Sequence, residues 1–124
     1  MEAATQLIKA EVGSLLLIDE ELQQLYFEVA LGDKEETVKT VTLQIGEGIA
    51  GWVAQHGKPL IVNEPEKDPR FFKGMDSRTG FKTQNILCVP VKAKGRTIGV
   101  LEVINKQRKE GFDEEDLSLF FRSF

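Results

Sequence analysis

One acidic residue, Glu102, stands in a stretch of sequence that otherwise has the composition of a buried strand. The stretch RTIGVLEVINK, residues 96–106, is rich in branched apolar residues. Because side chains alternate along a strand, Glu102 should share a face with Val100 and Ile104. A carboxylate on an apolar face is costly unless a hydrogen bond or an ion pair satisfies it. Its partner is either another part of this chain or a bound ligand, and the pattern leaves both open.

A glycine-rich stretch, GEGIAG at residues 46–51, follows a predicted strand and opens a predicted helix. It matches the G-x-G-x-x-G spacing of dinucleotide-binding loops. That function also requires a second parallel strand after the helix, whereas here a short helix is followed by a long irregular segment. The backbone N–H groups of Ile49 and Ala50 could still receive an anion such as a phosphate. The alternative is a tight turn that merely tolerates glycine.

Other groups capable of catalysis are few. His56 is the single histidine and Cys88 the single cysteine, so neither has a second residue of its kind with which to build a metal site. Cys88 lies in ILCVP and is typical of a small core residue. Glu102 and Asp76 are both acids, but nothing in their spacing indicates the carboxylate pair of a hydrolase. We expect no catalysis, no metal and no cofactor.

Composition narrows the class of protein. The chain has 124 residues, a formal net charge of −4 and one cysteine, which fits a single domain in a reducing compartment. Lysine and arginine are scattered and form no basic stripe of the kind that binds nucleic acid. The longest apolar run, LLLI, is far too short to cross a membrane, and no signal peptide is recognisable. We expect a soluble cytoplasmic domain.

The apolar pattern predicts an α+β fold. Predicted strands cover residues 14–19, 24–31, 40–45, 60–63, 85–91 and 97–105. A short helix should end at Gly57, and residues 64–84 form a long segment rich in proline, glycine and charge. Sequential hairpins predict a central antiparallel sheet of five to six strands. We expect the terminal helices on one face and the short helix plus the long loop on the other.

The C-terminal stretch FDEEDLSLFFRSF carries a strong helix start. Asp113 is placed as N-cap and Asp116 at the third helical position, with Phe112 and Leu117 at the staple positions. Residues 2–11 also have helical apolar spacing but no cap. Both ends therefore look cut, and we expect residues 1–124 to be one domain excised from a longer chain, with truncated terminal helices.

The stretches GEGIAGWVAQHGKPLIVNEPEKDPRFF and TGFKTQNILCVPVKAKGRTIGVLEVINK, with FDEED after them, resemble the GAF domains of cyclic-nucleotide phosphodiesterases and cyclases. The resemblance runs from about Ser14 to Phe124 and preserves the order of the elements. It implies a ligand pocket between the sheet and the mid-chain helix and loop. It also implies a regulatory role, an output domain in the same full-length chain and a homodimer formed through the terminal helices.

The resemblance also implies site residues. It places in the pocket Ser14, Ile49, Ala50, Phe72, Asp76, Thr79, Thr83 and Glu102. The family's motif of Asn-Lys, Phe and Asp-Glu is matched at Asn105, Lys106, Phe112 and Asp116, with Leu117 in place of the glutamate, and it implies a Lys106–Asp116 ion pair. At the end of the second strand, Ala30 and Leu31 replace the aromatic and the carboxylate that contact a base. Turn capping by the threonines and a structural role for Glu102 remain alternatives.

These observations lead to one main functional hypothesis and one alternative. The main hypothesis is a non-catalytic sensor of a small anionic ligand, with cAMP or cGMP as the leading candidates. The alternative is a dimerisation or scaffolding module without a ligand. Reduction of free methionine sulfoxide, known in some GAF domains, requires several cysteines. A chromophore would require an attachment cysteine in the pocket region, whereas Cys88 falls on a predicted core strand.

Overall fold

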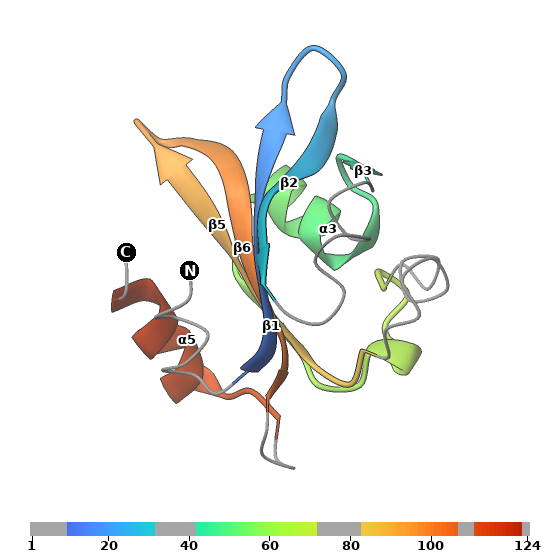
Figure 1. Cartoon of the computed structure of the whole chain (residues 1–124), viewed down its shortest axis with the longest axis vertical. Coiled ribbons are helices and arrows are strands. Elements are labelled where there is room, and N and C mark those ends of the chain that lie inside the picture. Colours follow the sequence, from blue (N-terminus) through green and yellow to red (C-terminus); the bar gives the residue numbers. More distant parts are fainter. Residues whose placement is uncertain (1–9, 32–41, 72–82, 107–110, 123–124) are drawn as a thin grey trace.

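The computed structural model describes residues 10–31, 42–71, 83–106 and 111–122. Within these residues a curved sheet separates helix α3 from helix α5 (Figure 1). The strands are β1 (Ala10–Asp19), β2 (Gln24–Leu31), β3 (Thr42–Gln44), β4 (Leu60–Val62), β5 (Ile86–Ala93) and β6 (Arg96–Lys106). The helices are α3 (Gly48–His56), the single 3₁₀ turn η1 (Pro65–Lys67) and α5 (Glu114–Arg122). No helix in this part of the chain is long and apolar enough to cross a membrane.

The six strands form one sheet in the order β3-β2-β1-β6-β5-β4. Every neighbouring pair is antiparallel, as the succession of hairpins predicted. β6 lies between β1 and β5 and is the longest strand. The predicted α+β fold with a central antiparallel sheet is therefore confirmed.

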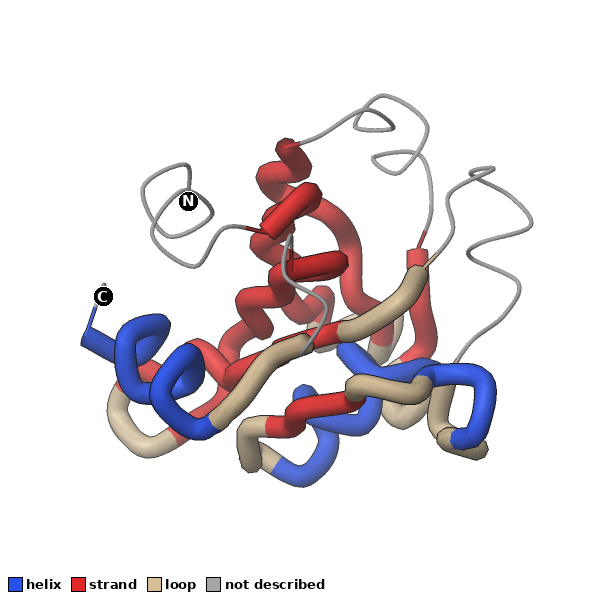
Figure 2. The backbone as a smooth tube through the Cα atoms, turned by 90° about the horizontal axis from the view of Figure 1, so that it is seen from below, coloured by secondary structure: helices blue, strands red, loops and turns tan. Residues whose placement is uncertain are grey.

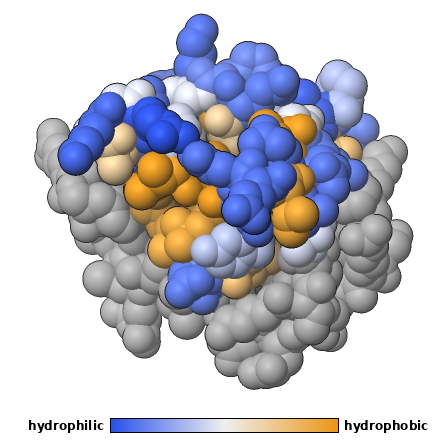
Figure 3. Space-filling model, turned by 90° about the horizontal axis from the view of Figure 1, so that it is seen from above, coloured by the Kyte–Doolittle hydropathy of each residue, from blue (hydrophilic) through white to orange (hydrophobic). Residues whose placement is uncertain are grey.

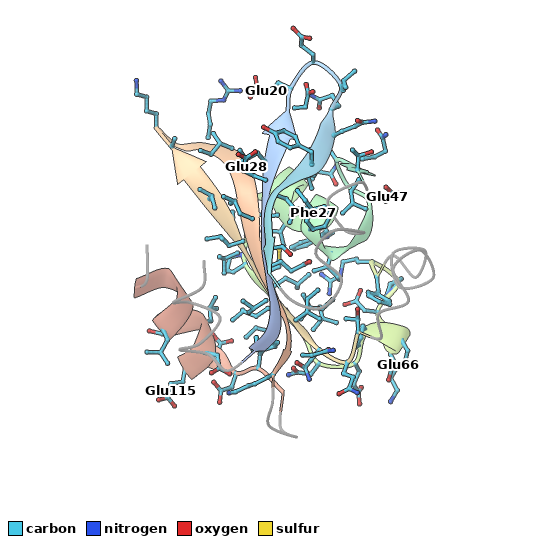
Figure 4. The ribbon with its side chains drawn as sticks, in the orientation of Figure 1. Glu20, Phe27, Glu28, Glu47, Glu66 and Glu115 are labelled. Atoms are coloured by element: carbon cyan, nitrogen blue, oxygen red, sulfur yellow. The ribbon has the colours of Figure 1, made fainter. Side chains whose placement is uncertain are left out.

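Each face of the sheet carries its own apolar core. On one face, α3 packs against β5 and β6 (Figure 1). The buried residues there are Leu16, Leu25, Leu43, Ile49, Ala50, Val53, Ala54, Val62, Ile86, Cys88 and Val100, and Phe27 points from β2 toward them (Figure 4). The second core comprises Ala10, Leu87, Val89, Leu101, Val103 and Phe112, with Leu117 of α5 packed against it. In the view from below, α5 also lies apart from the other helical segments (Figure 2).

The predicted helix ends are present. Gly57 takes a left-handed conformation, with φ of 66°, and its N–H donates to the carbonyl of Val53 at 2.8 Å. At α5, Asp113 Oδ1 accepts from the Asp116 N–H at 2.9 Å, and Asp116 Oδ2 accepts from the Asp113 N–H at 3.1 Å. This reciprocal pair is a capping box in which aspartate takes the place of glutamate.

The largest differences from the predicted strand boundaries are at the start of β1 and in the hairpin of β5 and β6. β1 begins at Ala10, inside the stretch that had helical spacing, because Ala10 pairs with Lys106 and so extends the ladder with the long β6. β5 and β6 run further into their hairpin than predicted, because a two-residue turn suffices to join them. Lys94 and Gly95 both have positive φ, as a type I′ turn requires. Residues 2–9 of the predicted first helix and residues 72–82 of the predicted long loop lie outside the described residues, whereas residues 64–71 and 83–84 of that loop are described.

The end of the molecule formed by the hairpin turns exposes apolar surface between polar side chains (Figure 3). Among the described residues, the exposed large hydrophobic side chains are those of Leu22, Tyr26 and Ile98. Nearby, an ion pair between Arg96 and Glu20 joins the two hairpins at the surface. Because both partners are exposed, this pair contributes little to stability.

A second ion pair is buried and connects the sheet to α5. Lys106 Nζ, at the end of β6, lies 2.5 Å from Asp116 Oδ2, and the two side chains are only 9% and 8% exposed. The resemblance implied this pair. Since Asp116 Oδ2 also accepts the Asp113 N–H, one carboxylate both caps α5 and neutralises Lys106.

We predict that Asp116→Ala destabilises the domain by about 3–5 kcal/mol, because it leaves the Lys106 ammonium buried without a partner. The measurement is chemical denaturation. Glu115→Ala is the matched control, since Glu115 is exposed on the same turn (Figure 4) and should change stability by less than about 0.5 kcal/mol. Equal losses in the two variants would contradict a stabilising role for the pair.

Candidate functional site

A row of three residues crosses the centre of the sheet beneath α3. Glu102 of β6 is paired with Ser14 of β1 on one side and with Cys88 of β5 on the other. Side chains of directly opposed residues point to the same face of a sheet. Cys88 belongs to the core that α3 covers, as does Val100, two residues before Glu102. The row therefore lies on the α3 face, as the alternation of the sequence predicted.

The Glu102 side chain is largely buried, and no hydrogen bond or ion pair joins its carboxylate to another described residue. The residue is 9% exposed, and no fully buried side-chain nitrogen or oxygen atom of the described residues lacks a hydrogen-bond partner, so the carboxylate oxygens keep some contact with solvent. Burial raises the pKa of Glu102 from its ordinary value of 4.5 to about 7. This carboxyl group therefore changes charge near neutral pH, at the centre of the sheet.

The neighbours of Glu102 in the row are small and buried. Ser14 is 1% exposed and Cys88 is completely buried. The pKa of the Cys88 thiol is raised well above its usual value, first by burial and then by the nearby charge of Glu102. A thiol with a raised pKa is a poor nucleophile, so Cys88 acts here as a packing residue.

The N-terminus of α3 joins the same core. Its first helical hydrogen bond runs from the Gly51 N–H to the Glu47 carbonyl at 3.1 Å, so the N–H groups of Ile49 and Ala50 precede it. The side chain of Glu47 does not cap them, because its carboxylate accepts the Gln44 N–H at 3.0 Å instead. Ile49 and Ala50 are 3% and 2% exposed, so these amides lie within the protein.

The structure thus places some of the predicted pocket residues together. Ser14, Ile49, Ala50 and Glu102 lie on or against the α3 face of the sheet. Thr83 is half-buried in the segment that enters β5. Ala30 of β2, one of the two residues at which the resemblance implied lost base contacts, is paired with Ser14 in the strand register. Phe72, Asp76 and Thr79 lie outside the described residues, and so does the carboxylate pair that Asp76 would form with Glu102.

Two asparagines fix the strand ends beside the motif residue Lys106. Asn85 Oδ1 accepts the Lys106 N–H at 2.8 Å, and Asn105 Oδ1 accepts the Gln84 N–H at 2.6 Å. Asn105 has a positive φ of 61°, which asparagine tolerates better than most residues. Sequence reasoning identified Asn105 through the family motif but missed Asn85. The available signal was an asparagine at the junction of a loop and a strand.

A second feature missed by sequence reasoning is a surface groove beside β4. Its volume is about 410 Å³, and it is lined by Ile61, Val62, Asn63, Glu64, Lys67, Asp68, Pro69 and Arg70. Asp68 and Arg70 form a two-point ion pair, with Nη2 to Oδ2 at 2.6 Å and Nε to Oδ1 at 2.9 Å. This pairing lowers the pKa of Asp68 and raises the pKa of Arg70. Both charges are therefore held in place.

Among the described residues, no group of three or more His, Cys, Asp or Glu side chains could hold a metal ion. The chemistry that the described residues offer is hydrogen bonding. Glu102 offers a carboxyl group, Ser14 a hydroxyl group, and Ile49 and Ala50 their backbone N–H groups. These groups are both donors and acceptors of hydrogen bonds.

Comparison with known proteins connects this geometry to a family. The chain is 37% identical over 115 residues to a probable 3',5'-cyclic phosphodiesterase, pde-5, of Caenorhabditis elegans. The match covers 86% of this chain and 16% of the relative, so the chain spans about a sixth of that protein's length.

Two solved structures show the same fold. The GAF domain of an Acinetobacter phosphoenolpyruvate-protein phosphotransferase aligns with a TM-score of 0.81 at 29% identity, over 98% of this chain and 70% of that one. A free methionine-R-sulfoxide reductase of Neisseria meningitidis aligns with a TM-score of 0.78 at 18% identity, over 98% and 66%. The sequence model described as GAF domain matches residues 1–122. The chain therefore belongs to the GAF domain family.

Proposed function

We propose that this GAF domain senses a small molecule between its sheet and α3 and regulates an output domain in a longer signalling protein. The observation that carries the proposal is Glu102, a buried carboxyl group without a described partner at the centre of the sheet. Buried polar groups are normally hydrogen-bonded. Acids whose pKa is shifted by burial cluster at functional sites, although structural acids are shifted as well.

The proposed ligand is small and carries hydrogen-bond donors on one side and an anionic group on another. Donors would satisfy Glu102 or Ser14, and the anionic group would meet the N–H groups of Ile49 and Ala50, where the α3 dipole favours negative charge. Cyclic nucleotides have both features, and they remain the leading candidates. The likeness to a probable cyclic phosphodiesterase supports them.

The regulatory part of the proposal follows from the length of that relative. Since the matched region is 16% of it, an output domain in the same full-length chain is the expected partner. We further propose that residues 1–124 are one domain of such a protein and that it forms a homodimer through its terminal helices. Binding would act by shifting the population between two conformations, which requires different affinities for the two.

A dimerisation module without a ligand is the second candidate. The close packing around Glu102 favours it, because Ser14 and Cys88 leave almost no exposed surface beside the carboxyl group. In that case Glu102 is simply held in its neutral form by burial.

We predict that a ligand at 100 times its dissociation constant adds about 2.7 kcal/mol to the free energy of unfolding. The measurement is a thermal-shift panel of cAMP, cGMP and common anionic metabolites. Glu102→Gln should weaken a ligand that donates to the carboxylate and leave the unfolding transition cooperative. Glu28→Gln, at an exposed position on β2, is the control (Figure 4). Absence of a shift with every compound would favour the module without a ligand.

We also predict that the ligand-free domain loses stability as pH rises from about 5 to about 8. The folded-state pKa of Glu102 is raised to about 7 from 4.5, so the folded protein binds the proton more tightly than the unfolded chain. The stabilisation is complete below about pH 4.5 and is lost as pH passes about 7. It amounts to roughly 3 kcal/mol.

The measurement for this pH dependence is urea denaturation of the domain and of Glu102→Gln at both pH values. Glutamine cannot ionise, so the variant should lack this component of the slope. Identical pH dependence in the two proteins would show that Glu102 does not titrate in this range and would remove the main support for the site.

A further inference from the structure

The segment from Asn63 to Phe71, here called the strap, contacts both α3 and the residues that lead into α5. It leaves the end of β4 at Asn63, passes through η1 and ends at Phe71. Between these points it forms the wall of the groove beside β4. One end thus contacts α3 and the other contacts Phe112, which precedes α5, and the two helices lie on opposite faces of the sheet (Figure 1).

At its C-terminal end the strap is attached to α3. The Arg70 guanidinium lies over the Trp52 ring, 4.9 Å from the centroid. The ring of His56 stacks on Trp52, with centroids 4.2 Å apart. Phe71 packs against the same core as α3. Since Asp68 fixes the orientation of Arg70 through two contacts, the attachment is rigid.

At its N-terminal end the strap is attached to the segment before α5. Asn63 Nδ2 donates to the Phe112 carbonyl at 2.9 Å, and Asn63 Oδ1 accepts the Phe112 N–H at 2.9 Å. One side-chain amide therefore satisfies both backbone groups of a residue 49 positions away. The pattern imitates one step of a strand ladder.

The absence of a side chain at Gly111 leaves room for the Asn63 amide. It has a positive φ of 76°, and a Cβ atom built on it would lie 2.4 Å from Asn63 Oδ1. A larger residue would push the amide away. Phe112 itself is 2% exposed in the core beneath α5, and the next residue, Asp113, caps that helix. A displacement of Asn63 would therefore act directly on the start of α5.

We propose that the strap couples α3 to α5, with Asn63 as the joint on the α5 side and Arg70 as the joint on the α3 side. The function of this coupling rests on the proposed sensor role, because α3 would cover the ligand. A change in the position of α3 then reaches α5 through eight residues, without passing through the sheet. Asn63 is exposed, so the joint can be removed without opening a cavity in the core.

The test is amide hydrogen exchange of the ligand-free chain, comparing α5 amides at residues 117–122 with β6 amides at residues 100–103. Asn63→Ala should raise exchange in α5 about tenfold relative to β6, because two hydrogen bonds that position α5 are lost. Arg70→Ala lies further from α5 and should raise α5 exchange by a smaller factor of about two to three. Lys67→Ala is the matched control, since Lys67 lies in the strap but pairs only with Glu64 at the surface.

Two results would overturn the coupling. One is unchanged α5 exchange in Asn63→Ala, and the other is an Arg70→Ala effect no larger than that of Lys67→Ala. The combined variant Asn63→Ala with Arg70→Ala provides a further check. If the two joints act along a single path, the increase of α5 exchange in the combined variant is smaller than the product of the two separate increases. None of these measurements needs a ligand. If no compound of the ligand panel binds but the exchange measurements show the coupling, the sensor proposal is contradicted and the coupling is not.

Discussion

The structure depends on the burial of β6 from every side. This strand has a neighbour on each edge, and its central residues, from Gly99 to Val103, are all buried. The two cores exist because consecutive residues of β6, Leu101 and Val103 on one face and Val100 on the other, must all be covered. The cover on one face is α3, and the cover on the other is α5.

That constraint gives Glu102 its significance. A glutamate on a solvated face of a sheet is charged at neutral pH, whereas burial here raises the pKa of Glu102 to about 7. A carboxyl group that ionises near neutral pH can accept hydrogen bonds from one ligand or donate its proton to another. The sensor proposal and the pH dependence of stability thus have a common origin, which is the desolvation of one side chain.

Local sequence rules were sufficient for the order of the strands and for the helix ends that carry capping signals. The αL cap at Gly57, the box at Asp113 and Asp116, and the exposure pattern of the strands follow from backbone chemistry within a few residues. The site is a different case. Glu102 could be found because an acid interrupts an apolar alternation, but its partners in the row depend on strand register. The side-chain amide of Asn63 forms hydrogen bonds with the backbone of a residue 49 positions away, and no local sequence pattern predicts such a contact.

The chain has a single cysteine, and its thiol is enclosed at the centre of the sheet. Alkylating reagents would therefore reach it only when this part of the core opens, so its labelling rate reports that opening without any engineered probe. The same shielding leaves the native surface free of reactive sulfur. A thiol introduced on α5 or on the strap could then carry a spectroscopic label without background, which makes movement between the two faces of the sheet directly observable.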